Sequence, residues 1–125
     1  MRSSQSRLAA LAYESFCYVT TRGRVTDRAH TIEIWFALRG GTIYVLAGGR
    51  ERADWVRNIM RHPEVTVRIS DRVFDGRGRI VTDDGEDRLA RELVVDKYQP
   101  SYGGDLDTWR RTALPVAVDL DTNGP

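Results

Sequence analysis

The stretch HTIEIWFAL, residues 30–38, alternates regularly between two kinds of side chain. One side of an extended chain would carry Ile32, Ile34, Phe36 and Leu38, and the other would carry Thr31, Glu33, Trp35 and Ala37. This period of two is typical of a β-strand with one face against an apolar core. The RGG at 39–41 then predicts a tight turn, and TIYVLA at 42–47 predicts the second strand of a hairpin.

Further strands and helices are expected on both sides of this hairpin. The strands are SFCYVTT at 15–21, EVTVRIS at 64–70, RVFDGRGRIVT at 72–82 and LPVAVDL at 114–120. The helices are expected at 4–14, within 48–63, at 83–98 and within 103–113. Five or six antiparallel strands with helices between hairpins predict an α+β fold built on a small β-barrel. A doubly wound dinucleotide fold is not expected, because no parallel strand–helix rhythm with a glycine fingerprint occurs.

The length, composition and net charge of the chain limit the class of protein. The chain of 125 residues, 41% of them apolar, fits one domain over 1–125, with a helical arm at 1–14 and a frayed tail at 121–125. A net charge of +1 gives no general attraction to nucleic acid. The single cysteine, Cys17, excludes an internal disulfide and a thiol metal site, so no metal is expected. The polar N-terminus does not resemble a secretory signal, and a cytoplasmic location is the simplest expectation.

A cationic turn precedes the decisive strand. Gly23 allows a sharp turn, and Arg22 and Arg24 place two planar guanidinium groups beside it, a combination that suits a phosphate. His30 could add a donor at the start of the next strand. The alternative is an ordinary solvated turn, because no phosphate-binding lysine motif or GxGxxG accompanies the arginines.

A second candidate region follows the strand at 42–47. Gly48 and Gly49 come after a strand and before a helix, an arrangement that leaves backbone N–H groups free for an anion or a ring carbonyl. Trp55 and Asn58 share one side of that helix, since they are three residues apart, and Asp54 lies at its start. The alternative is that Trp55 is a core residue and Asn58 caps a local turn.

Several aromatic residues are also candidates for a pocket. Trp35 lies opposite the predicted core face, so it needs a cover from a helix, a partner subunit or a flat ligand. Tyr98, Tyr102 and Trp109 form a late aromatic set that could line a pocket or fix a short helix. No Ser-His-Asp or Cys-His arrangement accompanies them.

The order of these motifs resembles a known family. TTRGRVTDRAHTIEIWF, LAGGRERADWVRNIMRHPEVTVRI and LPVAVDL are similar to the deazaflavin (F420)-dependent nitroreductase and quinone reductase family, over about 15–120. That family has a split β-barrel fold related to the flavin-binding pyridoxamine-phosphate-oxidase-like proteins. The resemblance implies an enzyme that transfers hydride from reduced coenzyme F420 to an electron-poor small molecule, namely a quinone, an enone or a nitro compound.

The resemblance also implies site residues. The phosphate and tail of the cofactor would contact Thr21, Arg22, Gly23, Arg24 and His30, and the deazaflavin ring would border Gly48, Gly49, Asp54, Trp55 and Asn58. The acceptor pocket would include Trp35, Tyr98 and Tyr102, and no single catalytic residue is implied. A homodimer is expected.

Two departures from the family pattern bear on these expectations. Val25 stands where the family loop has a lysine, so Arg28 or His30 would have to compensate for that tail contact. Leu46 and Ala47 stand where the nitro-drug-reducing members have a serine–tyrosine pair, which argues against activity on bulky nitroaromatic compounds. The alternatives are an FMN-dependent reductase of the same fold, or a non-catalytic binder of a cofactor or lipid-like ligand. Membrane contact by the N-terminal helix remains an open alternative to capping of the barrel.

Overall fold

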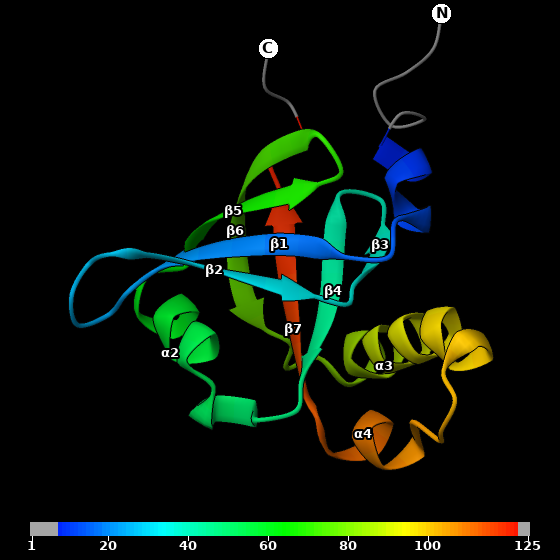
Figure 1. Cartoon of the computed structure of the whole chain (residues 1–125). Coiled ribbons are helices and arrows are strands. Elements are labelled where there is room, and N and C mark those ends of the chain that lie inside the picture. Colours follow the sequence, from blue (N-terminus) through cyan, green and yellow to red (C-terminus); the bar gives the residue numbers. More distant parts are fainter. Residues whose placement is uncertain (1–7, 123–125) are drawn as a thin grey trace, which may run out of the picture.

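The computed structural model describes residues 8–122, and a single antiparallel sheet of seven strands forms its centre (Figure 1). The strands are β1 (Cys17–Arg22), β2 (Ala29–Ile34), β3 (Ala37–Arg39), β4 (Thr42–Ala47), β5 (Glu64–Ile69), β6 (Arg72–Ile80) and β7 (Leu114–Leu120). The α-helices are α2 (Asp54–Arg61), α3 (Asp84–Tyr98) and α4 (Asp107–Thr112). Single turns of 3₁₀ helix occur at η1 (Leu11–Tyr13), η2 (Arg50–Arg52) and η3 (Gln99–Ser101).

The sheet curls so that its two edge strands are consecutive in the chain. The strand order is β2-β1-β5-β6-β7-β4-β3, so β2 and β3 lie at opposite edges, yet only Trp35 and Phe36 separate them in sequence. The chain therefore crosses from one edge of the sheet to the other within two residues, as a curled, barrel-like sheet requires. This confirms the predicted α+β split barrel, with seven strands instead of about six, because the expected strand at 30–38 is two strands.

The alternation in that segment survives the break between the strands. Phe36 lies in the apolar core inside the curled sheet, and Ile32, Ile34 and Leu38 pack against it. Trp35 and Ala37 belong to a second core outside the sheet. The predicted assignment of side chains to two faces is therefore confirmed.

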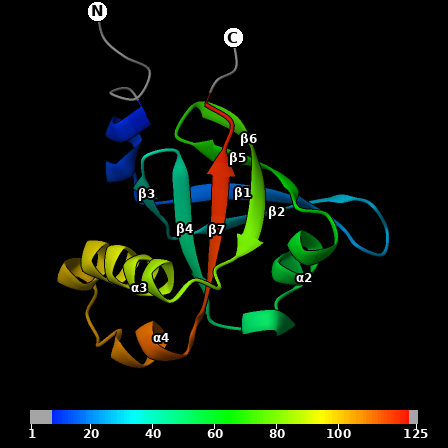
Figure 2. The same cartoon turned by 180° about the vertical axis from the view of Figure 1, so that it is seen from behind.

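The two cores lie on opposite faces of the sheet (Figures 1 and 2). In β7, Val116 and Val118 point into the inner core, while Ala117 between them packs in the outer core. Helix α2 contributes Val56 and Ile59 to the inner core, and a Cβ on Gly78 of β6 would lie 2.8 Å from Ile59 Cγ2, so glycine is required there. Helix α3 covers the outer core with Ala90, Val94, Val95 and Tyr98.

Helix α3 also fixes the crossing between β2 and β3. The Lys97 ammonium donates to the backbone carbonyls of Glu14 and Phe36, at 2.7 Å and 2.9 Å. The Tyr98 hydroxyl accepts from the Phe36 N–H at 3.0 Å and lies 2.8 Å from the Ser15 carbonyl. These bonds satisfy backbone groups that leave the sheet ladder at the crossing, and they hold the segment before β1 against it.

The start of the chain follows the prediction in part. Residues 8–10 are helical and continue into η1, with Leu8 buried and Leu11 packed against the inner core, while the rest of the predicted arm lies outside the described residues. The predicted tail begins directly after β7, and its last three residues, 123–125, also lie outside the described part. Within residues 8–122, no helix combines the length and the apolar character needed to cross a membrane.

Candidate functional site

The turn between β1 and β2 is held by its own backbone. The Gly23 N–H donates to the Arg28 carbonyl at 2.7 Å, and the Asp27 N–H donates to the Gly23 carbonyl at 3.0 Å. A Cβ on Gly23 would lie 3.1 Å from the His30 ring, so the small residue lets that ring lie against the turn. The turn therefore presents its side chains from a defined backbone.

Asn58 of α2 connects this turn to the core. Its amide nitrogen donates to the Thr21 hydroxyl at 3.1 Å, and its carbonyl oxygen accepts from the Arg24 N–H at 3.1 Å and from the Arg24 guanidinium at 3.0 Å. Arg24 also lies 3.3 Å from the Asp54 carboxylate. Thr21 and Asn58 are only 1% and 3% exposed, so a buried polar pair fixes the position of a partly exposed guanidinium.

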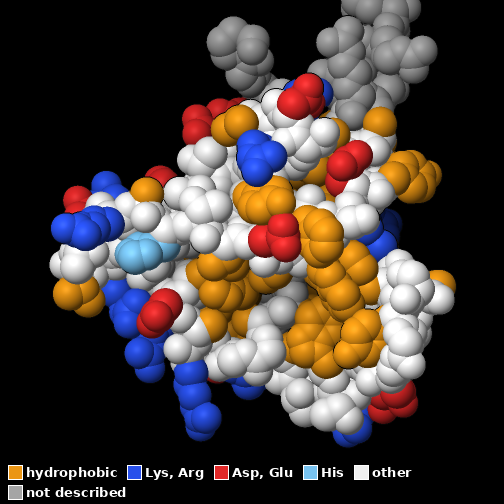
Figure 3. Space-filling view, viewed as in Figure 1, with side chains coloured by type: hydrophobic (Ala, Val, Ile, Leu, Met, Phe, Trp, Pro, Cys, Tyr) orange, Lys and Arg blue, Asp and Glu red, His pale blue; other side chains and the backbone are white. Residues whose placement is uncertain are grey.

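A cleft opens between this turn and α2. We call it the turn–helix cleft; its volume is about 460 Å³, and in Figure 3 it lies on the face that carries the histidine side chain drawn in pale blue. Six of the ten residues expected at the cofactor line it, although they come from segments about 30 residues apart. The full lining is Gly23, Arg24, Val25, Thr26, His30, Thr31, Ile32, Asp54, Trp55 and Asn58.

The other four expected cofactor residues lie elsewhere. Thr21, which is buried, and Arg22 border a separate hollow that also includes Asp27, and Arg22 pairs with Asp27 there at 2.8 Å. Gly48 lies beside the Trp109 ring, since a Cβ there would be 3.5 Å from Trp109 Nε1. Gly49 directly precedes η2, which separates both glycines from α2. The glycines follow β4 and precede a helix, as predicted, but a 3₁₀ turn stands between them and α2.

A second hollow surrounds Trp35. The Trp35 ring stacks on the Tyr98 ring at 4.3 Å with an angle of 3° between the planes, and the Tyr102 and Trp109 rings stand at 85° to it, each 5.8 Å away. We call the adjoining space of about 510 Å³ the aromatic hollow. Its lining is Trp35, Tyr102, Asp105, Leu106, Thr108, Trp109 and Thr112.

The aromatic hollow includes residues that the sequence did not single out. The cover expected over Trp35 is Tyr98, from α3, and the late aromatic set forms the surrounding walls. Asp105, Leu106 and the two threonines of α4 were not expected in a pocket, and no pattern in the sequence identifies them. Gln99 places this segment, because its side chain donates to the Gly104 carbonyl at 2.7 Å and accepts from the Leu106 N–H at 2.9 Å.

The two buried side chains with strongly raised pKa values, Cys17 and Tyr98, offer no nucleophile. Burial raises the pKa of Cys17 to about 12, so its thiol stays protonated at neutral pH. Burial also raises the pKa of Tyr98 to about 12, and its hydroxyl is engaged with the backbone of the crossing. Among residues 8–122, no group of three or more His, Cys, Asp or Glu side chains could hold a metal ion. The side chains can thus bind and orient a ligand, but they supply no evident redox or covalent chemistry.

Solved structures share this fold at low sequence identity. A structure named as an F420-H2 dependent reductase is 18% identical with a TM-score of 0.68, covering 86% of this chain and 94% of that one. A protein provisionally described as a pyridoxamine 5′-phosphate oxidase from Listeria innocua is 16% identical with a TM-score of 0.69, covering 94% and 93%. A third structure, described as a domain-swapped dimer, is 20% identical with a TM-score of 0.68, covering 86% and 80%.

Sequence comparison identifies the family. No curated protein sequence matches the chain. The sequence model of the F420H(2)-dependent quinone reductases matches residues 2–121, which is nearly the whole chain. The protein therefore belongs to the F420H(2)-dependent quinone reductase family and is an F420H2-dependent oxidoreductase.

Proposed function

We propose that the turn–helix cleft holds coenzyme F420 and that the aromatic hollow holds the electron-poor small molecule that is reduced. The observation that carries the proposal is the Thr21–Asn58–Arg24 network, which holds a partly exposed guanidinium at the wall of a cleft. Such a fixed guanidinium suits an anionic group, because the protein does not have to order the arginine when the ligand binds.

The lining of the cleft fits both parts of a deazaflavin cofactor. Arg24 and His30 stand at the turn, where an anionic phosphate and tail would find positive charge and hydrogen-bond donors. Trp55 and Ile32 provide apolar surface for a flat ring. Val25 replaces the lysine of the family pattern, and the exposed Arg28, which makes no ion pair among residues 8–122, stands three residues along the same turn. Arg28 would therefore take the place of that lysine.

The positions of the turn–helix cleft and the aromatic hollow are suited to binding the cofactor in one and the acceptor in the other. Ile32 lines the turn–helix cleft and Trp35 lines the aromatic hollow, and residues three apart in an extended segment are separated by about 10 Å. When bound, the reduced deazaflavin supplies a hydride, which is chemistry that the side chains lack. The protein would position the acceptor against Trp35, and the apolar walls would keep water away from it. Quinones, enones and small nitro compounds are the expected acceptors.

A homodimer is part of the proposal. The support is the fold shared with a protein described as a domain-swapped dimer. Two large apolar side chains near the start of β1 also remain exposed, Tyr13 at 88% and Phe16 at 43%, and a second subunit would cover such surface. Sedimentation velocity at several protein concentrations tests the assembly directly.

Two measurements test the proposed function. Calorimetric titration with F420 and, separately, with FMN should give saturable binding of F420 and weaker or no binding of FMN. Absorbance of reduced F420, followed with and without 2-methyl-1,4-naphthoquinone, should then show oxidation that depends on the acceptor. Preferential binding of FMN would replace the proposal by a flavin reductase, and tight F420 binding without turnover on quinone, enone and nitro acceptors would leave a non-catalytic binder.

A further inference from the structure

The aromatic hollow combines three aromatic side chains with a single carboxylate, that of Asp105. We propose that it binds planar aromatic cations, and that the acceptor reduced by this protein belongs to that class. The binding half needs no cofactor; the reduction half rests on the function proposed above.

The walls of the hollow are suited to a cation. Two indoles and a phenol, those of Trp35, Trp109 and Tyr102, line one space, and Tyr102 is 46% exposed. Their perpendicular arrangement offers both ring faces and ring edges to a flat guest. Because the face of an aromatic ring carries negative charge, and indole most of all, such a group of rings attracts a positively charged ring more strongly than a neutral one.

The charged side chains at the hollow also favour a cation over an anion. Asp105 is the one charged side chain in the lining, and it is exposed. One of its oxygens accepts from the Asp107 N–H at 2.9 Å, a local turn contact that leaves the second oxygen available. Arg50, which donates to the Thr112 carbonyl at 2.7 Å, pairs with Glu51 at 3.4 Å. The two arginines of α4, Arg110 and Arg111, pair with Asp96 and Asp107, so these three arginines add little net positive charge. The hollow therefore attracts cations and repels anions.

The chemistry of such an acceptor also suits the lining. In the reduction a C–H bond forms at a carbon of the acceptor ring with the electron pair of the hydride, and the positive charge of the ring is lost. The donor C–H bond breaks, and the second hydrogen of the two-electron donor leaves as a proton to solvent. No protein acid is needed, and the only titratable side chains in the lining are Asp105 and Tyr102. The neutral product loses its attraction to the carboxylate and the rings, which favours its release.

Binding is tested first, without cofactor, by calorimetry with N-methylquinolinium, neutral quinoline and anionic 1-naphthoate. We expect the cation to bind best and the anion not to bind. Asp105→Asn keeps the oxygen that accepts from Asp107 but removes the charge, and it should weaken cation binding about threefold to fivefold without affecting quinoline. Trp109→Leu should weaken cation binding about tenfold, while Trp109→Phe, which keeps a ring, should weaken it less.

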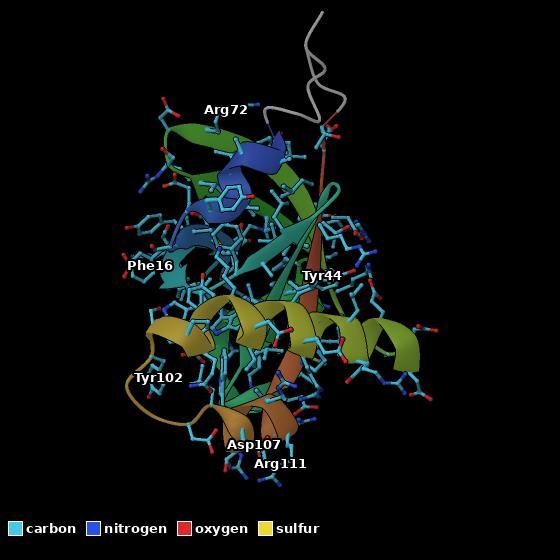
Figure 4. All side chains as sticks on the ribbon, turned by 90° about the vertical axis from the view of Figure 1, so that its right-hand side faces the viewer. Phe16, Tyr44, Arg72, Tyr102, Asp107 and Arg111 are labelled. Carbon is cyan, nitrogen blue, oxygen red and sulfur yellow. The ribbon has the colours of Figure 1, made fainter. Side chains whose placement is uncertain are left out.

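The matched control is Asp107→Asn. Asp107 is two residues from Asp105 but pairs with Arg111, and Figure 4 shows both on the outer side of α4, away from Tyr102. This variant should leave cation binding unchanged. Equal affinity for N-methylquinolinium and quinoline, or equal effects of Asp105→Asn and Asp107→Asn, would overturn the proposal.

Turnover separates this proposal from the function that it extends. With reduced F420, and after subtraction of the rate without protein, N-methylacridinium, which accepts hydride at a ring carbon, should show a lower KM than 1,4-naphthoquinone-2-sulfonate, and Asp105→Asn should narrow the difference in KM. Selective cation binding with no turnover on any acceptor would support the binding site and reject the proposed function. Turnover on both acceptors with equal KM, and no preference for the cation in binding, would support the function and overturn the charge selectivity.

Discussion

The side-chain amide of Asn58 donates to the hydroxyl of Thr21 over 3.1 Å, and both residues are almost completely buried. This bond joins the end of β1 to α2 beneath the turn–helix cleft. Since the same Asn58 side chain accepts two hydrogen bonds from Arg24, one buried amide couples the stability of the fold to the position of the arginine. A change at Asn58 should therefore affect both folding and ligand binding.

Asn58→Leu is expected to lower the free energy of unfolding by about 1–3 kcal/mol, because the buried Thr21 hydroxyl then lacks its partner. Urea denaturation measures this loss. Thr21→Val in the same background should restore part of the stability, since it removes the unsatisfied hydroxyl. If Asn58→Leu and the double variant unfold at the same urea concentration, the Thr21–Asn58 bond does not stabilise the junction between β1 and α2.

Arg24→Ala is expected to weaken F420 binding by about 1–3 kcal/mol, the scale of a charge-assisted hydrogen bond. Calorimetric titration measures the change. The control is Arg77→Ala, which removes an arginine paired with Glu64 on exposed strands outside the cleft. An unchanged affinity in Arg24→Ala, or an equal loss in Arg77→Ala, would remove the turn from the cofactor site.

The sequence predicted the elements and faces well because their causes are local. Alternation in HTIEIWFAL placed Phe36 and Trp35 on opposite faces, and the structure confirms this. The break between β2 and β3 could not be predicted, because it arises from the curl of the whole sheet and not from any breaker residue. Neither glycine nor proline marks the crossing; Lys97 and Tyr98, about 60 residues later, satisfy its backbone.

The candidate sites were predicted only in part, for a similar reason. Spacing on α2 placed Trp55 and Asn58 on one side, and both line the turn–helix cleft. The bond from Asn58 to Thr21 joins residues 37 positions apart, and no periodicity in the sequence indicates such a pair. Asp105 lines the aromatic hollow because of the path of the loop between α3 and α4, and the Gln99 side chain fixes that path. Contacts set by a loop path are not encoded in a local pattern.

Trp35→Leu is expected to raise the KM of the acceptor severalfold and to leave F420 affinity unchanged, since Trp35 lines only the aromatic hollow of the two spaces. The lost stacking on Tyr98 should also reduce stability by roughly 0.5–1.5 kcal/mol beyond the lost apolar area. Steady-state kinetics and thermal denaturation measure the two effects, and Trp35→Phe, which keeps a ring to stack, should show less of both. A parental KM together with parental sedimentation would mean that Trp35 only packs against α3.

Acid should destabilise the protein through Arg79. Its guanidinium makes two bonds of 2.7 Å to Glu86 and one of 2.7 Å to Asp119, and these bonds lower the pKa of both carboxyl groups. A folded-state pKa below the unfolded value gives stability that is present above the unfolded pKa and lost as the pH falls through the folded one. From pH 5 to pH 3, Arg79→Gln should therefore lose less stability than the parent, by about 1 kcal/mol, because the groups are partly exposed. Unfolding free energies of the parent and of Arg79→Gln that fall equally from pH 5 to pH 3 would contradict this.

At alkaline pH, by contrast, Lys97 should make a contribution to stability that increases as the pH rises. Burial between α3 and the crossing lowers the pKa of Lys97 from 10.5 to about 8, while the unfolded chain keeps the ordinary value. Between these values the unfolded state binds more protons, so the stability contribution of Lys97 rises as the pH increases from 8 to 10.5. Cys17 and Tyr98, whose pKa values are raised, oppose this rise, but they are present in every variant compared. The parent should therefore gain about 1–2 kcal/mol relative to Lys97→Met over this range, whereas Lys97→Arg, which stays charged, should show no such gain. Chemical denaturation at closely spaced pH values measures the difference, and a constant offset between parent and Lys97→Met would show that the ammonium at the crossing does not lose its proton there.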